Sequence, residues 1–140
     1  MNIRTHSEAE TLTWAEKYAA TLHGGEVLLL RGDLGAGKTV FVRGLARALG
    51  YDRAVRSPTF TLLNIYKTKH PTIRRLVHLD LYRLAEAPLE TIGLEEWLND
   101  PETVLAIEWP TAELVLASDL VVRQLSFRRL SETEREIVAV

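Results

Sequence analysis

The chain of 140 residues contains no cysteine. This absence excludes a disulfide scaffold, a thiolate metal site and a cysteine nucleophile. No apolar run approaches the roughly 20 residues that a membrane-spanning helix needs, and residues 1–14 lack the apolar stretch of a signal peptide. Seventeen Lys and Arg residues stand against nineteen Asp and Glu residues, so no overall basic field attracts nucleic acid. These absences predict a cytoplasmic protein that does not contact a membrane.

The composition is that of an ordinary globular protein, with 46% hydrophobic and 26% charged residues. The length suits one domain over residues 1–140, because no linker, internal repeat or low-complexity tract divides the chain. Two short runs, residues 27–30 and 104–107, are apolar on both faces, as in parallel strands that helices cover. The pattern predicts an α/β domain with a mostly parallel central sheet flanked by helices.

Other segments complete this expected architecture. Ser7 and Glu10 have the spacing of a capping box, and the helix that follows is expected to reach Leu22 and to end before Gly24 and Gly25. The remaining expected elements are a helix over 40–49 closed by Gly50, strands over 60–66 and 76–81, a helix over 88–98 broken by residues 99–101, and C-terminal antiparallel strands over 120–129 and 137–140 that form a hairpin near Ser131.

The run Gly32-Asp33-Leu34-Gly35-Ala36-Gly37-Lys38-Thr39 matches the phosphate-loop pattern G-x-x-x-x-G-K-[ST]. Glycines allow a turn that aims backbone N–H groups at a phosphate chain, and the following helix presents its positive end. Lys38 can bind the β- and γ-phosphates, and the Thr39 hydroxyl can bind Mg²⁺. A mere strand-to-helix turn is the alternative, but an apolar strand precedes the motif and a helix follows it. The sequence therefore predicts a nucleotide-binding P-loop NTPase-type domain.

Polar residues at the ends of two expected strands add candidate site residues. Glu108 ends the second apolar run, where parallel sheets place ligands, and this position favours a metal-side acid over a solvated strand end. Asp80 shares one strand face with His78, and it could hold a water or an attacking hydroxyl, or equally cap a turn or pair with an arginine. We expect His78 to be a hydrogen-bonded structural histidine rather than a base.

Thr59 follows Ser57-Pro58 between the phosphate loop and the next strand. Switch I segments occupy this place in many nucleotide hydrolases, and a threonine there can close on Mg²⁺ and the γ-phosphate. Taken alone, the segment favours a simple proline turn that enters a strand.

Four segments together resemble the TsaE family, also called YjeE, which consists of small bacterial P-loop ATPases of tRNA threonylcarbamoyladenosine biosynthesis. The resemblance covers nearly the whole chain. The four segments, in chain order, are Gly-Asp-Leu-Gly-Ala-Gly-Lys-Thr (32–39), Ser-Pro-Thr-Phe-Thr-Leu (57–62), His-Leu-Asp-Leu-Tyr-Arg-Leu (78–84) and Ile-Glu-Trp-Pro (107–110).

The resemblance implies a role for each matching residue. Where many members carry an acidic residue before the tyrosine of the strand after the switch, this chain has Asn64-Ile65-Tyr66 and lacks that acidic group. The implied roles are ATP binding by Gly32, Asp33, Gly35, Ala36, Gly37 and Lys38, Mg²⁺ binding by Thr39 and Glu108, hydrolysis through Asp80, a switch contact by Thr59, a place beside the nucleotide for Trp109, and an approach to the adenine by Thr11.

The resemblance also implies the partners TsaD and TsaB, with tRNA reached only through their complex. ATP hydrolysis would let that complex turn over, while threonylcarbamoyl transfer would occur on TsaD. Three other functions remain open. A small-molecule P-loop kinase needs a lid, for which the short chain after Glu108 leaves little room. A GTPase needs an Asn-Lys-x-Asp segment, which the sequence lacks. A binding module would use ATP as a switch without useful turnover.

Overall fold

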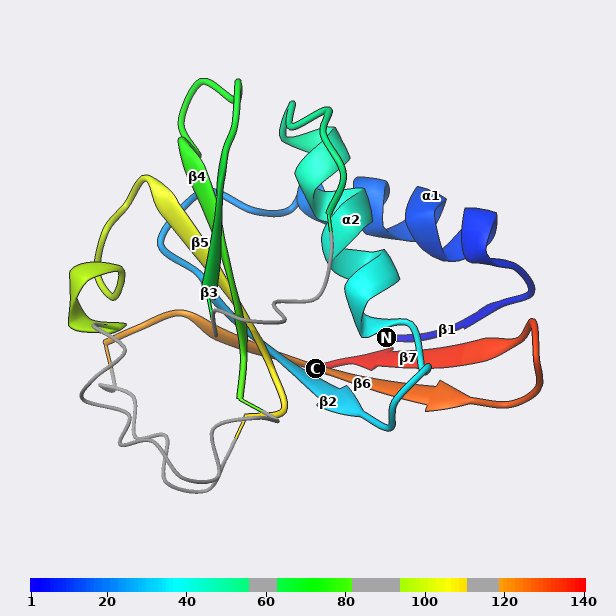
Figure 1. The fold of residues 1–140 in the computed structure, drawn as a ribbon. Coiled ribbons are helices and arrows are strands. Elements are labelled where there is room, and N and C mark those ends of the chain that lie inside the picture. The colour runs from blue at the N-terminus through cyan, green and yellow to red at the C-terminus, as the bar shows by residue number, and fades with distance from the viewer. Residues whose placement is uncertain (56–62, 82–93, 111–118) are drawn as a thin grey trace.

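The computed structural model describes residues 1–55, 63–81, 94–110 and 119–140. These residues form a seven-stranded sheet with the order β1-β7-β6-β2-β5-β4-β3, and two α-helices (Figure 1). The elements are β1 (Asn2–Thr5), α1 (Glu8–Ala19), β2 (Val27–Gly32), α2 (Lys38–Ala48), β3 (Leu63–Lys67), β4 (Arg75–Asp80), the 3₁₀ turn η2 (Leu94–Glu96), β5 (Thr103–Glu108), β6 (Val122–Arg129) and β7 (Arg135–Ala139).

The four central strands run parallel, because β2 pairs in parallel with both β5 and β6, and β5 pairs in parallel with β4. The outer pairs, β1 with β7, β7 with β6 and β3 with β4, are antiparallel. The predicted α/β P-loop fold, with a mostly parallel centre and C-terminal antiparallel strands, is confirmed. In this register Leu30 of β2 and Asp80 of β4 both lie beside Glu108 of β5, so the carboxyl ends of three strands meet at one edge.

Both α-helices cover the same face of the sheet (Figure 1). Four aromatic rings join the helices to that face, with neighbouring centroids 5.4–5.6 Å apart: Trp14, Tyr18, Phe41 and Phe127. Such clusters stabilise a core beyond their buried area. A smaller cluster on the opposite face includes Leu94 of η2 and the fully buried Ile107. In the part of the chain that the structure describes, no helix is long and apolar enough to span a membrane.

The helix ends follow the predicted signals with two differences. The Ser7 hydroxyl accepts from the Glu10 N–H at 3.1 Å, but the Glu10 carboxylate binds the His6 N–H, one residue before the position that a capping box uses. Helix α1 ends at Ala19, earlier than expected, and i→i+3 turns carry the chain on to the buried Leu22. Gly50, with φ of 94°, ends α2 as predicted.

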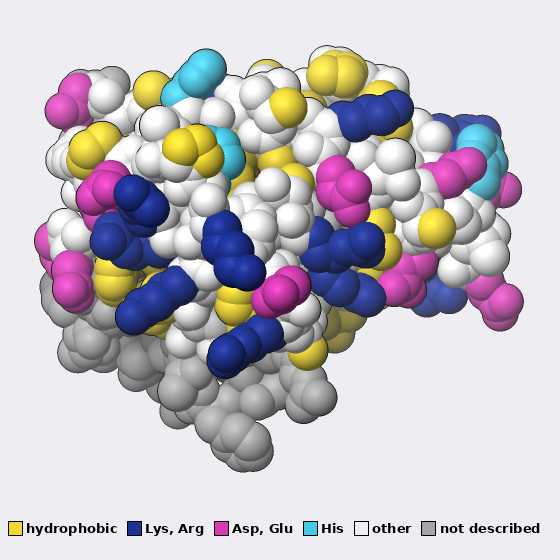
Figure 2. Space-filling model, turned by 90° about the horizontal axis from the view of Figure 1, so that it is seen from above, with side chains coloured by type: hydrophobic (Ala, Val, Ile, Leu, Met, Phe, Trp, Pro, Cys, Tyr) yellow, Lys and Arg dark blue, Asp and Glu magenta, His cyan; other side chains and the backbone are white. Residues whose placement is uncertain are grey.

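Strand β1 was not predicted. Its four residues pair with β7 near the other end of the chain, and so short a segment carries no periodic signal of its own. The predicted C-terminal hairpin is confirmed, with Leu130 N–H bonded to Glu134 O at its turn. Residues 60–62 and 88–93 of two expected elements lie outside the described residues, and Leu94–Glu96 forms a 3₁₀ turn where helix was expected. On the face seen in Figure 2, several Lys and Arg side chains lie close together across the middle and lower part of the described surface, with hydrophobic side chains between them.

Gly44 sets how closely the two helices approach. A Cβ at this position would lie 2.5 Å from the Ala15 Cβ and 2.9 Å from the Leu12 carbonyl oxygen, both on α1. In an open helix, Gly→Ala stabilises by about 1 kcal/mol. We expect the opposite here, because the added methyl group forces the helices apart.

Gly44→Ala should lower the free energy of unfolding by about 1–3 kcal/mol in urea titrations, which is the usual effect of overpacking. Adding Ala15→Gly to this variant should restore part of the loss, because it removes one of the two clashing groups. A Gly44→Ala protein at least as stable as the parent would show that the helices do not pack at this distance.

Candidate nucleotide-binding site

The phosphate loop connects β2 to α2. Gly32 ends β2 with φ of 143°, and a Cβ there would lie 2.3 Å from the Phe127 carbonyl oxygen, so only glycine fits beside β6. Gly35 and Gly37 also have positive φ, 76° and 105°. Gly37 is the N-cap of α2, and no side chain caps this helix or places an acid in its first turn. The first N–H groups of α2 are therefore available to an anion.

Lys38 is the buried cation of the site. Its side chain is 4% exposed, its Nζ donates to the Gly32 carbonyl oxygen, and the same atom lies 3.5 Å from the centroid of the Trp109 ring. Burial lowers the pKa of Lys38, while the nearby carboxylates of Glu108 and Asp80 act in the opposite direction. The lysine is thus held at the loop by a carbonyl dipole and a ring face, with its charge incompletely solvated.

Two carboxylates and an indole close the strand-end side of the site. Asp80 and Glu108 are the last residues of β4 and β5 and lie in register, 7% and 3% exposed. The Thr39 hydroxyl donates to Glu108 Oε2 at 3.4 Å, which links the start of α2 to the end of β5. Trp109 follows with φ of 58°, and its N–H bonds to the Leu30 carbonyl oxygen at 3.1 Å.

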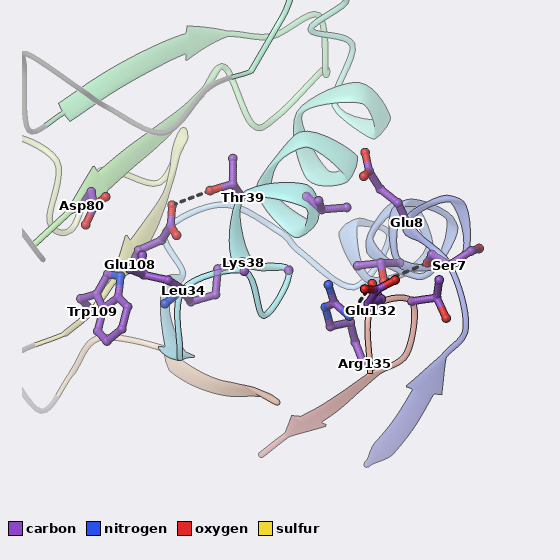
Figure 3. Close-up of a pocket in the computed structure, with 15 residues that line it drawn as sticks. Ser7, Glu8, Leu34, Lys38, Thr39, Asp80, Glu108, Trp109, Glu132 and Arg135 are labelled. Carbon is purple, nitrogen blue, oxygen red and sulfur yellow. Dashed lines mark hydrogen bonds between the residues drawn. The ribbon is translucent and has the colours of Figure 1, made fainter. Parts of the chain in front are cut away.

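These groups open into one cavity of about 620 Å³, large enough for a nucleotide (Figure 3). The phosphate loop and strand ends form one side, and the start of α1 with the β6–β7 turn forms the other. The lining residues are Ser7, Glu8, Thr11, Leu34, Gly35, Gly37, Lys38, Thr39, Val40, Asp80, Glu108, Trp109, Glu132, Thr133 and Arg135.

The structure brings most of the predicted site residues to this cavity and leaves three outside its lining. Asp33 is exposed, Ala36 is fully buried, and Gly32 acts through its carbonyl oxygen on Lys38. Thr59 lies outside the described residues. Those that line the cavity are Thr11, Gly35, Gly37, Lys38, Thr39, Asp80, Glu108 and Trp109.

The side of the cavity opposite the strand ends was not predicted from the sequence. Arg135 stabilises the β6–β7 turn by donating hydrogen bonds to the carbonyl oxygens of Ser131 at 2.8 Å and Glu134 at 2.9 Å. Together with Glu132, it lines the cavity. The sequence predicted this turn but not that it lies beside the cavity. Its position follows from the parallel pairing of β6 with β2, which places the hairpin next to the phosphate loop.

The donor set fits a magnesium nucleotide. Among the described residues, no group of three or more His, Asp or Glu side chains is arranged to hold a metal on its own. Mg²⁺ does not need such a cage, since it usually keeps several waters and takes one or two carboxylates together with substrate phosphates. Thr39 and Glu108, already in contact, are the residues that would hold it.

Known proteins resemble this chain over most of its length. The family model described as "Threonylcarbamoyl adenosine biosynthesis protein TsaE" matches residues 5–137. The chain belongs to the TsaE family. Two relatives named tRNA threonylcarbamoyladenosine biosynthesis protein TsaE support the assignment. The one from Aquifex aeolicus is 48% identical over 74% of this chain and 71% of its own. The one from Bacillus subtilis is 39% identical over 96% of this chain and 81% of its own.

The fold of this TsaE-family chain also matches a solved structure. The crystal structure of Bacillus subtilis YdiB superposes with a TM-score of 0.73 at 34% identity, covering 98% of this chain and 82% of that one. Ile65, at the position where the resemblance to the family implies an acidic residue, is 44% exposed on β3 and does not line the nucleotide-sized cavity. Position 65 therefore contributes no side chain to the described lining of this cavity.

The buried charge of Lys38 generates a stability prediction. Because burial disfavours its ammonium, Lys38→Met should leave the free energy of unfolding of the ligand-free protein unchanged or raise it. Urea titrations without nucleotide measure this, with the exposed Lys17→Met as the control. If the free energy of unfolding fell by more than about 1 kcal/mol in Lys38→Met but not in the control, the lysine would stabilise the fold, which would contradict this prediction.

Proposed function

We propose that this TsaE-family chain binds Mg²⁺-ATP in the cavity and hydrolyses it in the cytoplasm, in support of tRNA threonylcarbamoyladenosine modification. The observation that carries the proposal is the convergence of Lys38, Thr39 and Glu108 on one cavity at the start of α2. The relatives' name supplies the process: each is called a tRNA threonylcarbamoyladenosine biosynthesis protein.

Phosphate binding rests on charge and on free donors. The uncapped N–H groups at the start of α2 and the Lys38 ammonium face the same cavity, so a phosphate chain would receive backbone hydrogen bonds and a full positive charge together. An anion would also compensate the positive charge of Lys38, which the Gly32 carbonyl oxygen and the Trp109 ring compensate only in part. The loop is thus suited to a polyphosphate rather than to a neutral ligand.

Metal binding would use the existing contact between Thr39 and Glu108. A magnesium ion would neutralise charge on the phosphates and orient them for transfer. The Thr39 oxygen at the start of α2 and the Glu108 carboxylate at the end of β5 would hold it. Asp80 lies beside Glu108 and lines the cavity, which suits a residue that orients the attacking water.

We further propose that hydrolysis is slow in the isolated chain and faster with TsaD and TsaB. Rapid phosphoryl transfer needs a cation beyond the phosphate-loop lysine, and an arginine finger is worth about 10³–10⁵ in rate. Among the described residues, the other cavity-lining cation, Arg135, donates to three carbonyl oxygens of its own turn. Docking of the partners would organise the site and couple binding to hydrolysis.

A small-molecule kinase remains the alternative enzyme, with less support. Such a kinase needs a lid and a pocket for the second substrate. Strands β6 and β7, which make up most of the described chain after β5, are sheet strands rather than a lid. Formation of a phosphorylated small molecule, rather than free phosphate, would favour the kinase.

Glu108→Gln tests the metal role, because it removes the charge and retains a side chain that can hydrogen bond with Thr39. The Mg²⁺ concentration that half-saturates ATP binding should rise at least about tenfold, while ADP binding without metal stays nearly unchanged. Calorimetric titrations at graded Mg²⁺ measure both quantities, with the exposed Glu102→Gln as the control. Superimposable Mg²⁺ titrations of Glu108→Gln and parent would remove Glu108 from the metal site.

Asp80→Asn tests the hydrolytic role. The variant should bind ATP and join TsaD and TsaB, yet hydrolyse ATP at least about 10²-fold more slowly and fail to support repeated rounds of tRNA modification. Steady-state phosphate release and multiple-turnover modification assays measure these, with the exposed Asp119→Asn as the control. Full multiple-turnover activity in Asp80→Asn, or equal rates with and without partners in the parent, would contradict this mechanism.

A further inference from the structure

His78 lies fully buried behind the nucleotide-sized cavity, which it does not line. Its Nε2 hydrogen bonds with Glu108 Oε2, and its Nδ1 lies 3.4 Å from the Tyr66 hydroxyl. The three residues come from β4, β5 and β3, three adjacent strands. A histidine predicted to be structural is thus bonded directly to the expected metal-side acid.

The direction of these hydrogen bonds follows from the groups involved. A carboxylate oxygen accepts hydrogen bonds, so His78 carries a hydrogen on Nε2, and this N–H donates a hydrogen bond to Glu108. On the other side, the Tyr66 hydroxyl accepts from Asn64 Nδ2 at 3.3 Å, and the Tyr66 ring packs on Tyr51 with centroids 4.8 Å apart. Tyr66 therefore contacts the second ring nitrogen from a fixed position and limits how the imidazole can turn.

The two oxygens of Glu108 have different surroundings. Oε2 accepts from both His78 and Thr39, whereas Oε1 has no hydrogen-bond partner among the described residues. Because Glu108 is 3% exposed and lines the cavity, its small accessible surface faces the place where phosphate and metal would lie. The hydrogen bond from His78 fixes Oε2, and Oε1 can then bind a cation or a water molecule of that cation.

We propose that His78 is a positioning residue of the metal site, which fixes the Glu108 carboxylate so that Oε1 is presented to the cavity. This inference rests on the proposed function, since it assigns a role toward the same magnesium ion. His78 acts through Glu108 and not on the nucleotide. Its loss should therefore weaken metal binding and leave metal-free nucleotide binding intact.

The test compares His78→Leu, which removes the donor and keeps an apolar side chain, with His78→Gln, whose amide can donate from near the place of Nε2. Calorimetric ATP titrations at graded Mg²⁺ give the half-saturating Mg²⁺ concentration, and ADP titrations in EDTA give the metal-free affinity. We expect the Mg²⁺ requirement to rise about 10–100-fold in His78→Leu and to return to within about threefold of the parent in His78→Gln.

Each result decides between a positioning and a merely structural role. Unchanged Mg²⁺ dependence in His78→Leu would overturn the proposal, as would an equal loss of metal and metal-free binding that His78→Gln does not restore. If His78→Leu does not fold, His78→Asn decides, because its shorter amide lies near the place of Nδ1 and does not reach Glu108: a raised Mg²⁺ requirement with normal ADP affinity supports the proposal, and no change overturns it. A parent that binds no nucleotide would overturn the proposed function itself, which is a separate and recognisable outcome.

Discussion

The parallel pairing of β5 between β2 and β4 is the constraint on which the site depends. It brings the ends of three strands to one edge, where the phosphate loop leaves β2, Asp80 ends β4 and Glu108 ends β5. Because the strands are buried on both faces, neither carboxylate can shift without disturbing the core. The sheet register therefore places the two acids beside the end of β2, from which the phosphate loop leads to Lys38 and Thr39 at the start of α2.

This arrangement concentrates charge in the interior. Lys38, Asp80 and Glu108 are all less than a tenth exposed, and His78 is fully buried. Buried charges lower stability unless they are paired and hydrogen bonded. A carbonyl oxygen and a ring face meet this requirement only in part for Lys38, and His78 hydrogen bonds with Glu108. The proposed magnesium nucleotide would add further partners.

The predictable parts of the fold and of the site were those with local signals. The phosphate loop, the apolar strands and the C-terminal hairpin carry their signals within a few residues, and the position of Glu108 follows from the strand that it ends. Strand β1, the cavity wall around Arg135 and the bond from His78 to Glu108 depend on pairings between distant segments. The sequence shows the residues but not the register that joins them. His78 was accordingly expected to be hydrogen bonded, without its partner being identified.

We propose above all that Lys38 and the amides at the start of α2 bind the phosphates of an adenine nucleotide. Calorimetric titration of ADP into the parent and into Lys38→Met, without Mg²⁺, is the decisive experiment, because it isolates the phosphate contacts from metal and from turnover. We expect the ADP affinity to fall at least about tenfold in Lys38→Met, a loss of about 1.4 kcal/mol in binding free energy. An ADP affinity in Lys38→Met equal to that of the parent would contradict it.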